Sequence, residues 1–199
     1  MKTKFATRDF VLLALLVAVL IVLGMVNIPQ PAGLSITFNM IPVAIAAIAL
    51  GMKGGAIIGG AFGLISFLQC FGIFGYSGMG AALVGISPFL SFVQRFCSRL
   101  LVGLITALVY RLTRKKLNIH VSSVITGFSA AFFNTLLFMS SLVLLFGGTD
   151  YLQGLIAGRS IMAFIIASVG INAVVEMIVA AVLTGTISAA LHKAGLIKE

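Results

Sequence analysis

Residues 10–52 read FVLLALLVAVLIVLGMVNIPQPAGLSITFNMIPVAIAAIALGM, a run of 43 residues without Asp, Glu, Lys or Arg. One α-helix needs about 20 apolar residues to cross a bilayer, so a charge-free run of this length predicts two membrane spans. The segment NIPQPAG at residues 27–33 supplies the break between them, because Pro and Gly interrupt helices. The run therefore predicts two helices joined by a hairpin inside a membrane.

The composition of the whole chain agrees with that prediction. Of 199 residues, 61% are hydrophobic and 9% are charged, and the mean hydropathy is +1.23. Soluble domains carry about 25% charged residues, which they need to cover their surface. The composition therefore excludes a soluble enzyme, a disordered chain and a free nucleic-acid binder, and it leaves an integral membrane protein. The two cysteines, Cys70 and Cys97, support no disulfide framework.

Two further runs, residues 54–94 and 117–149, also lack charged residues. The first is long enough for two spans, and glycines between residues 72 and 85, followed by Pro88, interrupt it. No internal repeat and no linker divides the chain. We therefore expect an all-α integral membrane protein, a single domain over residues 1–199 with six helices in one bundle. The expected spans are residues 8–26, 36–51, 54–72, 87–112, 119–147 and 159–191.

The basic residues predict how these spans are oriented, because loops on the cytoplasmic side collect Lys and Arg. Of the 13 basic residues, Arg95 and Arg99 fall inside a span and Arg159 falls on one side. The other ten fall on the opposite side: Lys2, Lys4, Arg8, Lys53, Arg111, Arg114, Lys115, Lys116, Lys193 and Lys198. We therefore expect a multi-pass protein of the cell membrane with both termini in the cytoplasm. Loops 27–35, 73–86 and 148–158 would then face outward.

Polar side chains inside the spans are the candidate functional residues, because charged groups in a bilayer are costly and usually paired or functional. Arg95 and Arg99 are four residues apart and share one face of the fourth span. Glu176, in the sixth span, follows Asn172 and Ser168 at the same spacing. The remaining candidates are Asn39, Gln69 and Asn134.

Two interpretations of these residues are open. In the first, Asn39, Gln69, Arg95, Arg99, Asn134 and Asn172 line a substrate cavity that is open to the outside, where arginine binds an anionic group. In the second, an Arg–Glu pair and amide hydrogen bonds hold the bundle together. Because Glu176 can neutralise only one arginine, and Arg99 lies nearer to it in depth, we expect Glu176 to pair with Arg99. Arg95 then remains as the better candidate for the ligand.

Small residues at four-residue spacing mark close helix packing. Gly55, Gly59 and Gly63 form such a stripe on the third span, where packing within the bundle is the expected role. Ala14 and Ala18 form another on the first span. That pair packs either within the bundle or against a partner protein.

Sequence motifs for catalysis are missing. The chain has no Walker loop, no HExxH, no GxSxG and no cluster of Cys, His or acids for a metal. We therefore expect no catalytic residue, no metal and no cofactor. A membrane enzyme acting on lipids would need an acid or nucleophile that the chain lacks, and an envelope scaffold would not need a polar interior. Glu176 as the one intramembrane acid equips the chain poorly for proton-coupled transport on its own.

Several segments resemble a known family. These are TFNMIPV at residues 37–43, ALGMKGGA at 49–56, RLLVG at 99–103, FNT at 133–135 and NAVVE at 172–176. With them, the chain resembles the substrate-binding (S) components of energy-coupling factor (ECF) vitamin transporters over nearly its whole length. It is most similar to the pantothenate branch, and it departs from the pattern at Ser98, where the family has Pro.

The resemblance implies a function and partners. An S component captures a small vitamin from outside and moves in the membrane against a transmembrane coupling protein that two ATPase subunits drive. The pair Ala14 and Ala18 matches the Ala-x-x-x-Ala pattern that docks on the coupling protein. Pantothenate is the first choice of ligand, because its carboxylate suits arginine. Another vitamin or precursor (pyridoxine, riboflavin or a queuosine precursor) is the alternative within the family. The outward loops 27–35 and 73–86 would act as lids.

Overall fold

The computed structural model describes residues 7–26, 28–29 and 35–197. The predicted basic residues Lys2, Lys4 and Lys198, and most of the predicted break at residues 27–33, lie outside the described residues. The described chain is helical apart from one short antiparallel pair, β1 (Ile28–Pro29) with β2 (Ser35–Ile36). The helices in chain order are α1 (Thr7–Met25), α2 (Met40–Leu68), the 3-10 helix η2 (Gln69–Phe71), α3 (Gly78–Ile86), α4 (Pro88–Thr113), α5 (Ile119–Phe146), α6 (Asp150–Ile156) and α7 (Ile161–Lys193).

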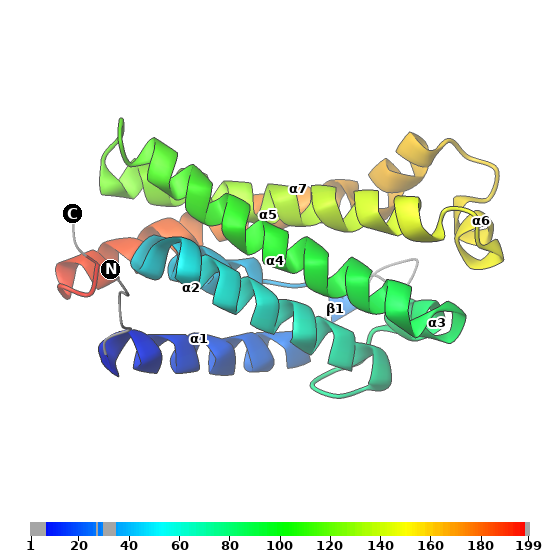
Figure 1. Ribbon diagram of the computed structural model, residues 1–199. Coiled ribbons are helices and arrows are strands. Elements are labelled where there is room, and N and C mark those ends of the chain that lie inside the picture. Colours follow the sequence, from blue (N-terminus) through cyan, green and yellow to red (C-terminus); the bar gives the residue numbers. More distant parts are fainter. Residues whose placement is uncertain (1–6, 27, 30–34, 198–199) are drawn as a thin grey trace.

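Five helical segments of the described chain are long and apolar enough to cross a membrane. They are Thr7–Met25, Met40–Phe71, Pro88–Thr113, Ile119–Phe146 and Asn172–Lys193. A sixth is obtained when α6 and the first part of α7, Ile161–Gly170, count as one span bent by 77°. The predicted all-helical membrane fold is thus confirmed, but this set of spans differs from the expected one. The expected span at 159–191 is divided at residues 170–172, and the expected loops at 73–86 and 148–158 contain the short helices α3 and α6. The long helices lie side by side with similar directions (Figure 1).

Helix α2 reverses direction within its own length. Gly51 has non-helical backbone angles, φ 63° and ψ −149°, and glycine adopts a positive φ without steric cost. A Cβ on Gly54 would lie 2.6 Å from the carbonyl oxygen of Ala46, although eight residues of straight helix span about 12 Å. The two halves of α2 therefore fold back against each other, between the segments expected as separate spans at 36–51 and 54–72.

The second half of α2 packs closely against α4 along the predicted glycine stripe. A Cβ on Gly59 would lie 2.6 Å from the Arg99 carbonyl oxygen, and a Cβ on Gly63 would lie 2.8 Å from the Cα of Phe96. Gly55 faces the backbone of Gly103 in the same way. The absence of side chains here lets the two backbones meet, as small residues do between membrane helices. This contact fixes the height of α4, and with it the height of Arg95 and Arg99, against α2.

Side-chain caps set where the helices begin. Ser87 accepts a hydrogen bond from the Leu90 amide, and Pro88 occupies the first position of α4, where its missing N–H costs nothing. Asn118 caps α5 and Ser160 caps α7 in the same manner. The short helices α3 and α6 lie at one end of the bundle, and the start of α1 and the end of α7 lie at the other (Figure 1). At that second end, Arg8 donates to the carbonyls of Gly195 and Leu196.

Candidate functional site

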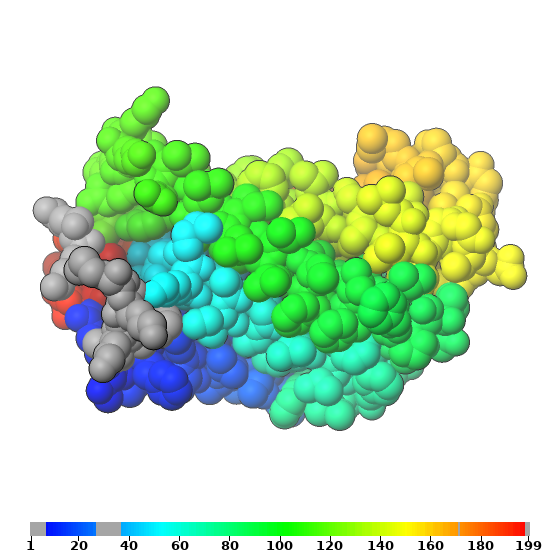
Figure 2. Space-filling view, viewed as in Figure 1, coloured from blue at the N-terminus to red at the C-terminus, as the bar shows by residue number. Residues whose placement is uncertain are grey.

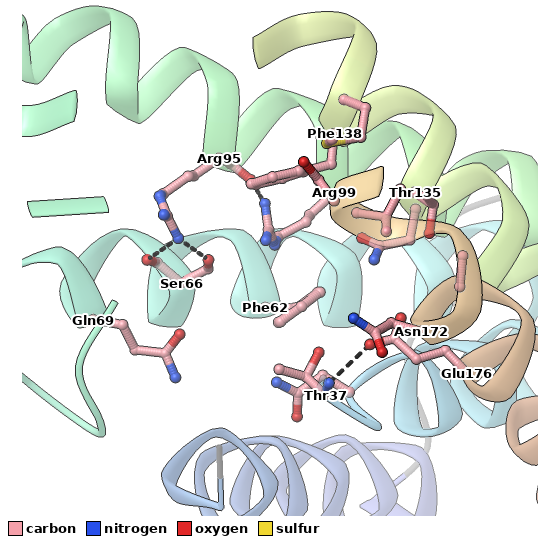
Figure 3. A pocket seen from close by; sticks show the side chains of 16 residues that line it. Thr37, Phe62, Ser66, Gln69, Arg95, Arg99, Thr135, Phe138, Asn172 and Glu176 are labelled. Atoms are coloured by element: carbon pink, nitrogen blue, oxygen red, sulfur yellow. Dashed lines mark hydrogen bonds between the residues drawn. The ribbon is translucent and has the colours of Figure 1, made fainter. Parts of the chain in front are cut away.

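A cavity of about 100 Å³ lies between α2, α4, α5 and α7 (Figure 3). The structure brings all six residues predicted from sequence to bind a substrate onto its wall, and Glu176 with them. They come from the start of α2, from η2, and from α4, α5 and α7, so only the tertiary fold makes them neighbours. The lining residues are Thr37, Asn39, Phe62, Ser66, Gln69, Arg95, Arg99, Asn134, Thr135, Phe138, Met139, Ser168, Val169, Asn172, Ala173 and Glu176.

Arg95 is buried and held by three hydrogen bonds. Its Nη1 donates to the Ser66 carbonyl at 3.1 Å and to the Ser66 hydroxyl at 2.8 Å, and its Nη2 donates to the Ser77 hydroxyl at 3.0 Å. Ser77 is also the N-cap of α3, where its hydroxyl accepts from the Gly80 amide at 3.2 Å. Arg95 therefore joins α4 to α2 and to the segment that enters α3.

Arg99 is buried to a similar extent but has fewer polar partners. Its Nη1 donates to the Arg95 carbonyl at 3.3 Å. The centre of its guanidinium lies 4.7 Å from the ring centroid of Phe62 and 5.0 Å from that of Phe138. Stacking on aromatic faces stabilises a guanidinium and leaves its edge available for hydrogen bonds. Within the described residues its Nε has no partner. Arg99 thus presents unused donors at the cavity (Figure 3).

Glu176 has a different partner from the one that the sequence suggested. Its Oε1 accepts a hydrogen bond from the Thr37 backbone amide at 2.9 Å, shown as a dashed line in Figure 3. The expected pair of Glu176 with Arg99 is therefore corrected. The Glu176 carboxylate on α7 holds the segment that leads into α2, and Arg99 donates its hydrogen bond to the Arg95 carbonyl. Depth counted along single helices could not foresee this, because Thr37 lies on a segment between helices.

The amide side chains divide into two groups. The side-chain nitrogen of Gln69 already has partners within the protein, since Nε2 donates to the carbonyls of Gly24 at 2.9 Å and Phe74 at 3.2 Å. Asn39 is almost fully buried, and Asn134 is half-buried. In the part of the chain that the structure describes, the Oδ1 atom of each of these two asparagines has no hydrogen-bond partner. Buried carbonyls without a donor are uncommon, so these two oxygens suit a ligand that carries hydroxyl or N–H groups.

The charges on the wall favour an anion. Two guanidinium groups face the cavity, and among the described lining residues Glu176 is the only acid. Removing charge from water is costly unless it is paired, so the excess positive charge favours a ligand that brings a negative group. The same wall carries the rings of Phe62 and Phe138, which give part of the cavity an apolar lining.

Sequence reasoning missed part of this wall, above all Thr37, Phe62, Ser66 and Phe138. Helical spacing carried a signal for one of them, because Phe138 follows the predicted site residue Asn134 by four residues. Ser66 could not be selected on its own, since serine is common in membrane helices and only its bond to Arg95 distinguishes it.

Ser98 lies on α4 between Arg95 and Arg99, where the resemblance noted from sequence led us to expect a proline. Its hydroxyl donates to the Gln94 carbonyl, one turn earlier on α4. A proline there would lack the backbone N–H and would disturb the helix at this turn. Serine keeps α4 regular between Arg95 and Arg99, so the two arginines stay on one face.

Ala14 and Ala18 lie on the outer face of α1. Both are exposed, whereas Leu13, Leu16 and Leu20 are buried against the rest of the bundle. The surface around the pair is apolar and includes Val11, Leu15 and Val22. Of the two roles considered for this pair, packing inside the bundle therefore does not fit the structure. The two alanines are small residues on an exposed apolar surface, which is available to lipid or to another protein.

Comparison with known proteins gives a consistent result. The family model described as "ECF transporter, substrate-specific component" matches residues 8–188. The pantothenic acid transporter PanT of Lactococcus lactis subsp. cremoris is 30% identical over 209 aligned positions, covering 96% of this chain and 97% of that protein. The pantothenate transporter PanT of Leuconostoc mesenteroides subsp. mesenteroides is 28% identical over 192 positions, covering 94% of this chain and 91% of that protein.

Proposed function

Because the chain belongs to the family of ECF transporter substrate-specific components, we propose that it captures pantothenate from outside the cell in the cavity around Arg99. Members of this family are binding subunits of transporters and not enzymes, and the chain is a multi-pass membrane protein. The observation that carries the choice of ligand is the excess of arginine over acid on the cavity wall. The printed names of the two relatives, which are pantothenate transporters, point the same way.

In this proposal the carboxylate of pantothenate binds Arg99. Arg99 makes one hydrogen bond to the protein, whereas Arg95 makes three. A guanidinium that lies within 5.0 Å of the ring centroids of Phe62 and Phe138 can offer its remaining edge to a carboxylate as a two-point contact. Arg95, which the sequence favoured for this role, instead positions the wall by holding Ser66 and Ser77.

The other end of pantothenate carries two hydroxyl groups and an amide. We place these groups toward Asn39 and Asn134, whose side-chain oxygens lack donors within the described structure. A hydroxyl or amide N–H that reaches such an oxygen satisfies a buried acceptor, which is where hydrogen bonds contribute most to selectivity. The ligand would thus lie across the cavity with its charge at α4 and its hydroxyl groups between α2 and α5.

Uptake needs an energy source that the chain itself does not encode, since it has no Walker loop. We propose the partners that the family implies: a transmembrane coupling protein and two ATPase subunits. The exposed step at Ala14 and Ala18 on α1 is the proposed docking surface. The basic residues at the end where α1 starts and α7 finishes support an orientation with both termini in the cytoplasm.

Calorimetry on the purified full-length protein tests the choice of ligand. The titrants are pantothenate, its neutral alcohol analogue pantothenol, riboflavin and pyridoxine. We expect saturable one-to-one binding of pantothenate and weaker binding of pantothenol, because the alcohol lacks the carboxylate. Binding of riboflavin or pyridoxine in preference to both would assign the chain to another vitamin. Equal binding of pantothenate and pantothenol would contradict the carboxylate contact.

A further inference from the structure

A second cavity, of about 380 Å³, opens at the opposite end of the molecule from α3 and α6. It lies where the reversal of α2 at Gly51 meets the last turns of α4. Figure 2 shows these parts of the surface in contact, with α2 in cyan and the end of α4 in green. We call this the basic groove; its lining includes Ile48, Met52, Ala107, Tyr110, Arg111 and Arg114, with Lys115 at its edge.

The groove has an apolar floor and a cationic rim. Ile48 and Ala107 are buried at its base, and Met52 is 40% exposed on its wall. Arg111 and Lys115 are exposed, and no acid occurs among the described residues that line the groove. Arg114 donates through Nη1 to the Leu117 carbonyl at 3.0 Å, but its buried Nε has no partner within the described chain. Arg114 also makes a side-chain hydrogen bond with Tyr110, so the exposed side chains of Arg111 and Lys115 supply most of the accessible positive charge at the rim.

The depth of the groove matches the polar edge of a bilayer. The helix α4, which is long and apolar enough to cross a membrane, ends at Thr113, so Arg114 and Lys115 follow directly after the apolar stretch, where we expect lipid headgroups. Tyr110, one turn below Arg114, is of the residue type that favours this interface, because its ring is apolar and its hydroxyl is polar. Basic pockets between membrane helices at this depth bind anionic lipid headgroups.

We propose that the basic groove is a binding site for an anionic phospholipid. The phosphate lies against Arg111, Arg114 and Lys115, and the first part of an acyl chain covers Ile48, Met52 and Ala107. The apolar floor selects a lipid over a soluble phosphate, because a free ion would leave that floor in water. The rim selects an anionic lipid over a zwitterionic one. The bound lipid would hold the reversal of α2 against α4, next to the Gly51 break.

Native mass spectrometry of the purified protein tests the proposal. The protein is titrated with phosphatidylglycerol, with phosphatidylcholine of the same acyl chains, and with glycerol 3-phosphate. We expect one phosphatidylglycerol to bind in preference to phosphatidylcholine, and no binding of glycerol 3-phosphate. The variant Arg111→Gln/Lys115→Gln alters two exposed side chains, and each lost cation should weaken binding of phosphatidylglycerol about fivefold.

A matched control removes the same charge elsewhere at that end of the molecule. Lys116→Gln/Lys193→Gln should leave the affinity for phosphatidylglycerol unchanged, since neither residue lines the groove. Met52→Trp should weaken phosphatidylglycerol binding by filling the apolar wall while all cations stay. Equal losses in the two double variants would overturn the proposal, because they would reflect net charge alone. Unchanged binding in Met52→Trp, or comparable binding of glycerol 3-phosphate, would overturn it as well, because the groove would then hold no acyl chain. If the groove binds an acidic protein segment and not a lipid, the affinity for phosphatidylglycerol should be the same in wild type and in Arg111→Gln/Lys115→Gln. That result would overturn the proposal.

Discussion

Arg95 and Arg99 differ in their hydrogen bonds although they share one helix face and similar burial. Three bonds to serine side chains and backbone hold Arg95, and one bond to the Arg95 carbonyl holds Arg99. The buried Nε of each arginine lacks a partner within the described residues, but Arg95 already uses both of its Nη atoms and Arg99 uses one. A guanidinium with more unused donors in a buried site gains more from a ligand. The two residues therefore have separable roles, one in positioning the wall and one in contacting the ligand.

The substitution Arg99→Gln tests this division. It should cost about 2–5 kcal/mol in pantothenate binding, roughly 30-fold to several-thousand-fold in affinity, because a buried charge contact is lost. Pantothenol binding should change little, so the preference for the acid disappears. Calorimetry with both compounds measures this directly. Arg99→Lys should recover part of the preference, since it restores the charge without the two-point geometry.

Arg95→Gln is the matched variant one turn away. It should lower the affinities for pantothenate and pantothenol by similar factors, because the variant loses the hydrogen bonds to Ser66 and Ser77 that shape the cavity for both ligands. The preference for the acid should survive. If Arg95→Gln abolishes that preference while Arg99→Gln keeps it, the carboxylate binds Arg95, as the sequence alone suggested.

The elements of the bundle carry small residues in two different settings. On α2, Gly59 and Gly63 face the α4 backbone, and a side chain there would collide with it. On α1, Ala14 and Ala18 are exposed in the described structure, so a larger side chain there would not enter the packed core. The same spacing of small residues thus serves internal packing on one helix and an open surface on another.

The outward position of Ala14 and Ala18 makes the docking proposal testable at this scale. Ala14→Leu or Ala18→Leu should abolish vitamin uptake in cells that contain the coupling protein, while calorimetric binding to the purified variant stays as in wild type. The physical reason is that the change fills a step in the surface and leaves the core untouched. Ala167→Leu, an equal enlargement at an exposed alanine of α7, is the control and should retain uptake. Loss of ligand binding in the α1 variants would contradict the docking role.

At the scale of the whole molecule, the cavity and the basic groove lie toward different ends of one bundle. Arg8 joins the start of α1 to the chain after α7, so both ends of the described chain meet at one end of the bundle. The described basic residues Lys53, Arg111, Arg114, Lys115, Lys116 and Lys193 were expected on that side from their sequence positions. Asp150 begins α6 and Arg159 follows its end, at the other end of the bundle.

Cysteine accessibility tests the orientation. Starting from a variant with Cys70→Ala and Cys97→Ala, single cysteines replace Lys115 or Asp150. An impermeant thiol reagent added to intact cells should label position 150 and spare position 115, because the basic end is held in the cytoplasm. Both positions should react after the membrane is opened, which is the control for accessibility. Labelling of position 115 in intact cells, equal to or above position 150, would contradict the orientation.

The sequence by itself determined the class of protein, the long helices and seven of the residues on the cavity wall, but not the short helices α3 and α6, which lie where loops were expected. These are local properties: an uninterrupted apolar run must cross a bilayer, and a polar side chain within it must point inward because lipid cannot solvate it. For that reason Asn39, Gln69, Arg95, Arg99, Asn134, Asn172 and Glu176 were found without knowing their neighbours. The hairpin at residues 51–54 was also readable, from charge spacing, although its turn at Gly51 was not.

Only the tertiary structure decided which hydrogen-bond partner each of those polar side chains has. A hydrogen bond depends on two atoms from different helices approaching to about 3 Å, and no periodicity along one helix specifies that distance. Thus Glu176 accepts a hydrogen bond from the Thr37 amide and does not pair with Arg99 as expected. Ser66 and Ser77 accept the hydrogen bonds that Arg95 donates. The basic groove likewise exists only because the α2 reversal is set beside the end of α4. The sequence determines which side chains must be kept away from lipid, and the packing of the helices determines which groups those side chains contact.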